Sequence, residues 1–149
     1  MGIFNFGKKA KTENNDFQSL GKAMGDELIE LYSKEIHMPF ENTTELERQV
    51  LAVYFFGMSN GLMQHLKLKN TPMEVAEIIK NNLVDVFKYS NEQAQQFLDT
   101  MISDLQSQDP NNTQYVIIHR GLDGYFAWEK GQKSNVIKDV CQIMGVLKG

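Results

Sequence analysis

The sequence predicts an all-α fold, a compact bundle of about six helices. Long apolar stripes recur at helical spacing, and no run of alternating β-branched residues is long enough to suggest a sheet. Capping boxes, in which a Ser or Thr precedes a helix and Glu or Gln follows three positions later, mark several helix starts. The chain contains three such pairs: Thr44 with Glu47, Thr71 with Glu74, and Ser90 with Gln93.

The bulk composition is typical of one globular domain. Of the 149 residues, 42% are hydrophobic and 23% are charged, and a chain of this length can bury a core without disulfides. The net charge of −4 argues against a nucleic-acid partner, because neutralising phosphates requires clustered Lys and Arg. The single cysteine, Cys141, lies in an apolar helical stretch, which predicts a buried core residue in a reducing compartment.

Two units are expected along the chain: a flexible N-terminal arm at residues 1–15 and a single helical domain at residues 16–149. The arm is rich in Lys, Asn and Gly and lacks periodicity, so its Phe4 and Phe6 are free to dock on the core or on a partner. It has no apolar signal-peptide core, and the apolar run at residues 50–58 is too short to span a bilayer. We therefore expect a cytoplasmic protein without membrane contact.

The first two helices are expected at residues 16–37 and from Thr44 to about residue 66. The first carries a single apolar stripe. In the second, every residue from 50 to 58 is apolar or Gly, so this helix should be covered on more than one side. Gly57 and Gly61 are four positions apart, which favours close approach of another helix backbone.

The remaining four helices are expected at residues 72–88, after Ser90, from beyond Pro110 to about residue 129, and at residues 135–147. Only about two residues separate the third helix from the fourth, which predicts an antiparallel hairpin or a sharp corner. The fifth helix has two apolar faces. We therefore expect the second and fifth helices to form the interior.

The three histidines do not predict a metal site. His37 and His65 close the first and second helices, and antiparallel packing would place these ends about 30 Å apart. A histidine near a helix C-terminus is explained by the helix dipole and the last carbonyls. The chain also lacks a Gly-rich phosphate loop, His-Glu-x-x-His and Cys-x-x-Cys, so we expect no metal and no cofactor.

The most polar interruption of the fifth helix contains His119, Arg120 and Asp123. His119 and Asp123 are four apart and share a face, and such a pair can act as a general base oriented by a carboxylate. However, no Ser or Cys nucleophile is tied to the pair by spacing. We interpret the segment as polar surface and predict no catalytic residue, hence no enzyme.

Three segments relate the chain to a known class of proteins: the apolar helix at residues 47–58, the Thr71-Pro72 helix start, and residues 118–129. Over residues 20–147 the chain resembles the small all-helical immunity protein families of bacterial polymorphic-toxin systems. The resemblance implies that the protein binds a cognate toxin in the cytoplasm, through the toxin's C-terminal toxic domain, and blocks it without catalysis. A net charge of −4 suits a basic toxin, because opposite charges raise the association rate.

The resemblance assigns no functional residues, so candidates for partner binding come from surface chemistry. They are aromatic and acidic residues expected at helix ends and in loops: Phe40, Glu41, Glu45, Asp104 and Asp109. Three alternatives stay open: a small-molecule-binding or sensor protein with a cavity among its eight Met and nine Phe, a helical hydrolase using His119 and Asp123, and a homodimeric scaffold. Both a monomer and a homodimer are compatible with the sequence.

Overall fold

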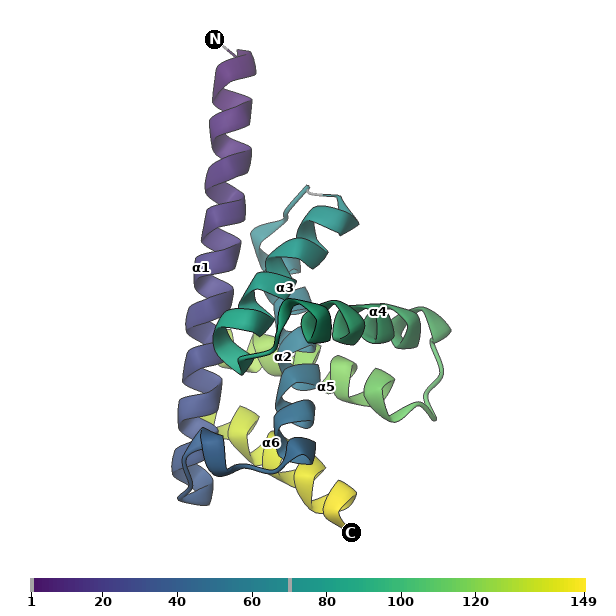
Figure 1. The fold of residues 1–149 in the computed structure, drawn as a ribbon. Helices are drawn as coiled ribbons and strands as arrows, with labels where there is room; N and C mark the ends of the chain where they lie inside the picture. Colours follow the sequence, from purple (N-terminus) through teal and green to yellow (C-terminus); the bar gives the residue numbers. More distant parts are fainter. Residues whose placement is uncertain (1, 70) are drawn as a thin grey trace.

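The computed structural model describes residues 2–69 and 71–149, with side chains described from residue 16 onwards. This part of the chain contains helices and no strand. In chain order (Figure 1) the elements are α1 (Gly2–Ile36), the 3₁₀ helix η1 (Phe40–Asn42), α2 (Glu45–Leu66), α3 (Pro72–Phe87), α4 (Asn91–Ser107), α5 (Thr113–Glu129) and α6 (Lys133–Lys148). The predicted all-α fold with six α-helices is confirmed.

All three predicted capping boxes form, at the starts of α2, α3 and α4. In each, the N-cap hydroxyl accepts a hydrogen bond from the backbone N–H three residues later, and that later side chain accepts one from the N-cap N–H. The start of α5 comes after a turn beyond Pro110, because Asn112 caps the helix: its Oδ1 accepts from the N–H of Tyr115 at 3.0 Å. The first residue of α6 is Lys133, two residues earlier than predicted.

The first helix is longer than predicted. It begins at Gly2 instead of residue 16, so the backbone of the expected arm is helical. Between Lys8 and Asn15 the sequence contains no Pro or Gly to end a helix, and it includes the good helix formers Lys, Ala and Glu. Figure 1 shows this N-terminal part of α1 extending past the other helices. The docking of Phe4 and Phe6 lies outside the described side chains, and the mobility of the arm stays a prediction.

The core is built around α2. Each residue from Val50 to Ser59 is buried, and α2 packs most extensively against α5. The expected interior position is therefore confirmed for α2. In contrast, α5 buries one face only, since His119, Asp123 and Phe126 are exposed.

Glycines allow α2 and α5 to touch backbone to backbone. A Cβ atom added at Gly57 would lie 2.1 Å from the carbonyl oxygen of Ile118, and one added at Gly121 would lie 2.2 Å from the carbonyl oxygen of Tyr54. Real Cβ atoms do not approach other atoms so closely, so neither glycine can be replaced without moving a helix. The close approach predicted from Gly57 and Gly61 is confirmed, with α5 as the neighbour.

A buried carboxylate joins three helices. Glu47 is 5% exposed, and its Oε2 accepts a hydrogen bond of 2.6 Å from the hydroxyl of Tyr32 on α1. Its Oε1 lies 3.5 Å from Nζ of Lys148 on α6 and also closes the capping box with Thr44. One side chain therefore both starts α2 and ties α2 to α1 and α6.

Candidate partner-binding site

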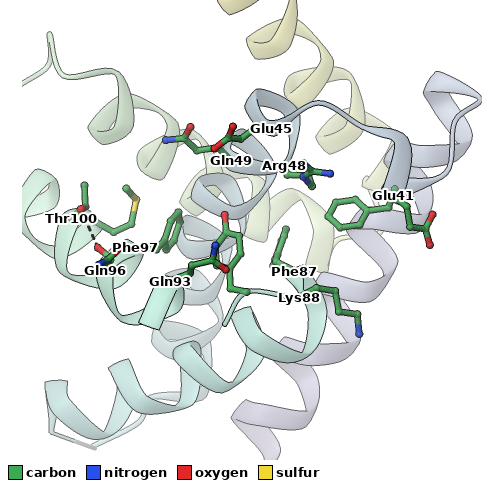
Figure 2. Close-up of a pocket in the computed structure, with 13 residues that line it drawn as sticks. Glu41, Glu45, Arg48, Gln49, Phe87, Lys88, Gln93, Gln96, Phe97 and Thr100 are labelled. Atoms are coloured by element: carbon green, nitrogen blue, oxygen red, sulfur yellow. Dashed lines mark hydrogen bonds between the residues drawn. The ribbon is translucent and has the colours of Figure 1, made fainter. Parts of the chain in front are cut away.

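A groove of about 730 Å³ lies between the first turns of α2 and the corner where α3 meets α4. Figure 2 shows the side chains that line it, contributed by η1, α2, the α3–α4 corner and α4. We call this feature the groove. Its lining comprises Phe40, Glu41, Glu45, Arg48, Gln49, Phe87, Lys88, Tyr89, Gln93, Gln96, Phe97, Thr100 and Met101.

Local structure sets the two walls of the groove. On one wall, Thr43 donates a hydrogen bond from Oγ1 to the carbonyl oxygen of Phe40 at 2.5 Å, and the Thr44 cap then starts α2. On the other wall, Lys88 ends α3 in the left-handed conformation with φ 63°, and the Ser90 cap starts α4 two residues later. The chain therefore turns sharply at the corner, as predicted from its short connection.

Aromatic rings form a continuous row along the groove. Phe40 and Phe87 have ring centroids 6.3 Å apart, those of Phe87 and Tyr89 are 6.4 Å apart, and those of Tyr89 and Phe97 are 5.7 Å apart. Phe87 also packs on buried Phe55 of α2, at 5.3 Å, so the row is anchored to the core. Phe87 itself is buried, so half-buried Phe40, Tyr89 and Phe97 provide the rigid aromatic surface, which gives contact area at a low cost in conformational entropy.

Charged side chains of both signs surround this aromatic row and do not form ion pairs with one another. Within the described part of the chain, the side chains of Glu41, Glu45 and Arg48 form no hydrogen bond or ion pair, and Nζ of Lys88 bonds to the backbone carbonyl of Asp85 at 2.7 Å. Some charges elsewhere in the described residues form ion pairs, such as Lys133–Glu27 at 2.7 Å, Lys34–Glu30 at 3.0 Å and His65–Glu129 at 3.2 Å. The groove thus offers unpaired carboxylates and cations to another molecule.

Charge and burial also act on the tyrosine in the middle of the row. Burial raises the pKa of the Tyr89 phenol, an effect that Arg48 opposes and Glu45 increases. The hydroxyl of Tyr89 therefore remains protonated over the whole neutral range and is a hydrogen-bond donor inside the groove.

The structure brings three of the five candidate residues together. Phe40, Glu41 and Glu45 line the groove, whereas Asp104 and Asp109 are absent from its lining. Asp104 accepts a hydrogen bond at 3.2 Å from Nδ2 of Asn112, and Asp109 accepts one at 2.9 Å from the backbone N–H of Asn111. Asp104 lies in the last turn of α4, and Asp109 follows that helix. Both carboxylates stabilise the connection between α4 and α5, a local role that acids near helix ends commonly have.

Other lining residues were missed because their signal was attributed to the core. Phe97 and Met101 belong to the apolar stripe of α4, and Gln93, Gln96 and Thr100 share their side of that helix. Helical spacing shows that these residues share a face, but it does not show which of them the neighbouring helices leave uncovered.

The polar segment of α5 does not assemble a site with the groove. Arg120 bonds to Asp139 and, at 3.1 Å, to Gln142, so its partners are on α6 and not at Asp123. His119 and Asp123 are exposed and do not line the groove, and His119 packs on Tyr115 with centroids 4.4 Å apart. The general base required for the hydrolase alternative therefore lies outside this concave surface.

The described residues contain neither a metal-binding cluster nor a membrane-spanning helix. Among them, no group of three or more His, Cys, Asp or Glu side chains is placed to hold a metal ion. No helix of this part of the chain has both the length and the apolar character needed to cross a membrane.

Comparison with known proteins identifies a family for most of this chain. The family model for Immunity protein 48 matches residues 22–148, a span that contains η1, α2–α6 and the whole groove. No match was found among curated proteins or among solved structures. The match covers most of the chain and agrees with the resemblance seen in the sequence. This chain belongs to the Immunity protein 48 family.

Proposed function

We propose that this protein is a cytoplasmic immunity protein that binds one cognate toxin molecule in the groove and blocks it without catalysis. Family membership supports a role in toxin immunity. The observation that supports a binding site in the groove is the row of aromatic rings bordered by the unpaired charges of Glu41, Glu45 and Arg48. In the proposal, these side chains contact the C-terminal toxic domain of the toxin.

The chemistry of the groove suits a protein surface better than a small apolar ligand. Eight of its thirteen lining residues carry a charge, an amide or an aliphatic hydroxyl. Small-molecule pockets are mostly apolar with few polar groups, whereas protein interfaces combine aromatic and Arg anchors with a polar rim. The partner would pair with charges that have no ion-pair partner in the described structure, so binding need not break existing pairs.

The test begins with capture of the tagged chain from its native bacterium and mass identification of the bound protein. The captured protein is then expressed alone. We expect it to stop growth, and co-expression of the chain to restore growth through a one-to-one complex. Captured proteins that are harmless on their own, or whose toxicity the chain does not relieve, contradict the proposal.

The groove is then tested by charge reversal. Glu45→Lys and Arg48→Glu should each weaken the complex, because each places the wrong sign against the partner, at a cost of about 1–3 kcal/mol. Glu77→Lys is the control, since Glu77 is exposed on α3 and does not line the groove. Equal neutralisation by all three variants and the wild-type chain would exclude the groove as the binding site.

A further inference from the structure

A second depression lies on the other side of the first turns of α2. We call it the apolar notch. It has a volume of about 130 Å³ and lies where α2, α5 and α6 meet. Its lining is mainly aliphatic and comprises Leu46, Gln49, Val50, Val53, Thr113, Gln114, Ile117 and Leu147.

The rim of the notch leaves apolar side chains in contact with solvent. Leu46 and Leu147 are each 37% exposed, and the neighbouring Val146 is 72% exposed. Single exposed apolar residues are normal, whereas apolar side chains gathered at the rim of a depression offer a partner a site for apolar contact. A cavity of about 150 Å³ accommodates benzene, so a notch of this size takes one side chain and not a helix.

The notch and the groove belong to one continuous surface. Gln49 lines both, and the adjacent residues Glu45 and Leu46 face the groove and the notch respectively. The two depressions are therefore separated by about one helix width, roughly 10 Å. An interface of ordinary size buries about 800 Å² on each partner, a patch roughly 30 Å across, so a protein bound in the groove would be wide enough to reach the notch.

We propose that the toxin inserts one apolar side chain, of leucine to phenylalanine size, into the apolar notch while its polar surface occupies the groove. This inference rests on the proposed function and adds a second anchor to it. A buried apolar side chain in a fitted pocket is a common type of binding hot spot, surrounded by polar contacts that exclude water. Here the groove would supply the polar contacts and the notch the apolar anchor.

The test uses two equivalent positions in two helices. Leu46 is the second residue of α2 after the Thr44 cap, and Met73 is the second residue of α3 after the Thr71 cap. Both are exposed apolar side chains, but Met73 lines neither the groove nor the notch. An acidic residue is favourable in the first turn of a helix, so Leu46→Glu and Met73→Glu should both fold normally.

The probe is the toxin obtained from the capture experiment proposed above, and its dissociation constant is measured by calorimetry. We expect Leu46→Glu to raise the dissociation constant at least about 30-fold, and Met73→Glu to leave it unchanged. Leu46→Gln should also weaken binding, because the loss is of apolar contact and not only of charge complementarity. Circular dichroism checks that the variants keep the wild-type helix content and melting temperature.

The possible outcomes separate this inference from the proposed function. Normal binding by Leu46→Glu, together with weak binding by Glu45→Lys, would exclude the notch as a toxin-binding site and keep the groove as one. Normal binding by both variants would overturn both sites. A wild-type dimer in solution that Leu46→Glu converts to a monomer would assign the notch to a second copy of the chain and overturn its assignment to the toxin.

Discussion

At the scale of single residues, Glu47 is held by contacts from three helices: the capping box of α2, Tyr32 on α1 and Lys148 on α6. Burial alone would raise the pKa of its carboxyl, but hydrogen bonds from Tyr32 and Thr44 and the charge of Lys148 outweigh burial, so the pKa is lowered. The sequence predicted only the local part of this arrangement, the capping box with Thr44. Tyr32 lies fifteen residues away, and its contact depends on how α1 packs on α2.

We predict that Tyr32→Phe lowers the free energy of unfolding by about 1–3 kcal/mol at pH 7, because a buried carboxylate loses a hydrogen-bond donor. The stability contributed by Glu47 is present above its unfolded pKa and is lost as the pH falls through its lower folded pKa. The deficit of the variant should therefore shrink in acid, below about pH 4. Urea denaturation of wild-type, Tyr32→Phe and Tyr115→Phe across this range measures it. A deficit equal to that of Tyr115→Phe would contradict the prediction.

At the scale of elements, the crossing of α2 and α5 was predictable in part. The spacing of Gly57 and Gly61 indicated a close helix contact, and Gly121 and Gly124 fell on one face of α5. The contact between these two glycine faces could not be predicted from the sequence of either helix alone, because it depends on which buried face of α2 each neighbouring helix covers.

Gly57→Ala should destabilise the protein by at least about 1–3 kcal/mol, because the added Cβ would collide with the backbone of α5 and force the two helices apart. Gly145→Ala on α6 is the matched control, since a Cβ there meets no atom within 4 Å. That substitution should stabilise the protein by about 0.5–1 kcal/mol, as Ala favours the helix. Thermal unfolding followed by circular dichroism compares them. Similar melting temperatures for the two variants would contradict the backbone contact.

Substitutions at the ends of α2 and α3 allow effects on stability to be separated from effects on toxin binding. Lys67 and Lys88 end α2 and α3 in the left-handed conformation, with φ 53° and 63°. Glycine adopts this conformation without strain, so Lys67→Gly and Lys88→Gly should each raise stability by about 0.5–1 kcal/mol. Only Lys88 lines the groove, so only Lys88→Gly should weaken toxin binding. Calorimetry with both variants tests this, and equal affinities would remove Lys88 from the proposed interface.

At the scale of the whole molecule, local signals were sufficient for the fold class and insufficient for the site. Caps and apolar spacing are properties of short segments, and the starts of α2, α3 and α4 fell at the predicted residues. The groove combines residues 40–49 with residues 87–101, and its shape exists only after these segments pack together. Surface chemistry alone therefore selected Phe40, Glu41 and Glu45, which line the groove, together with two acids that stabilise a turn.

The N-terminal part of α1 lies outside the segment that the family model matches. It extends past the other helices (Figure 1), and the family match begins only at residue 22. A helix end that extends past its neighbours is marginal in water, so backbone amides of residues 2–15 should exchange with solvent much faster than those of residues 24–36. Hydrogen exchange measures this directly. Protection equal to that of residues 24–36 would show that the arm is not mobile.

The backbone contact between Gly57 and Gly121 has a consequence for how such proteins diverge. It holds the groove's supporting helix in place through main-chain atoms, while the charged and amide side chains of the groove wall take no part in that contact. Substitutions at Glu41, Glu45 or Gln96 should therefore alter the proposed recognition surface without disturbing this backbone contact. Within the family, we expect a constant helical frame to present different groove chemistries, each matched to a different toxin.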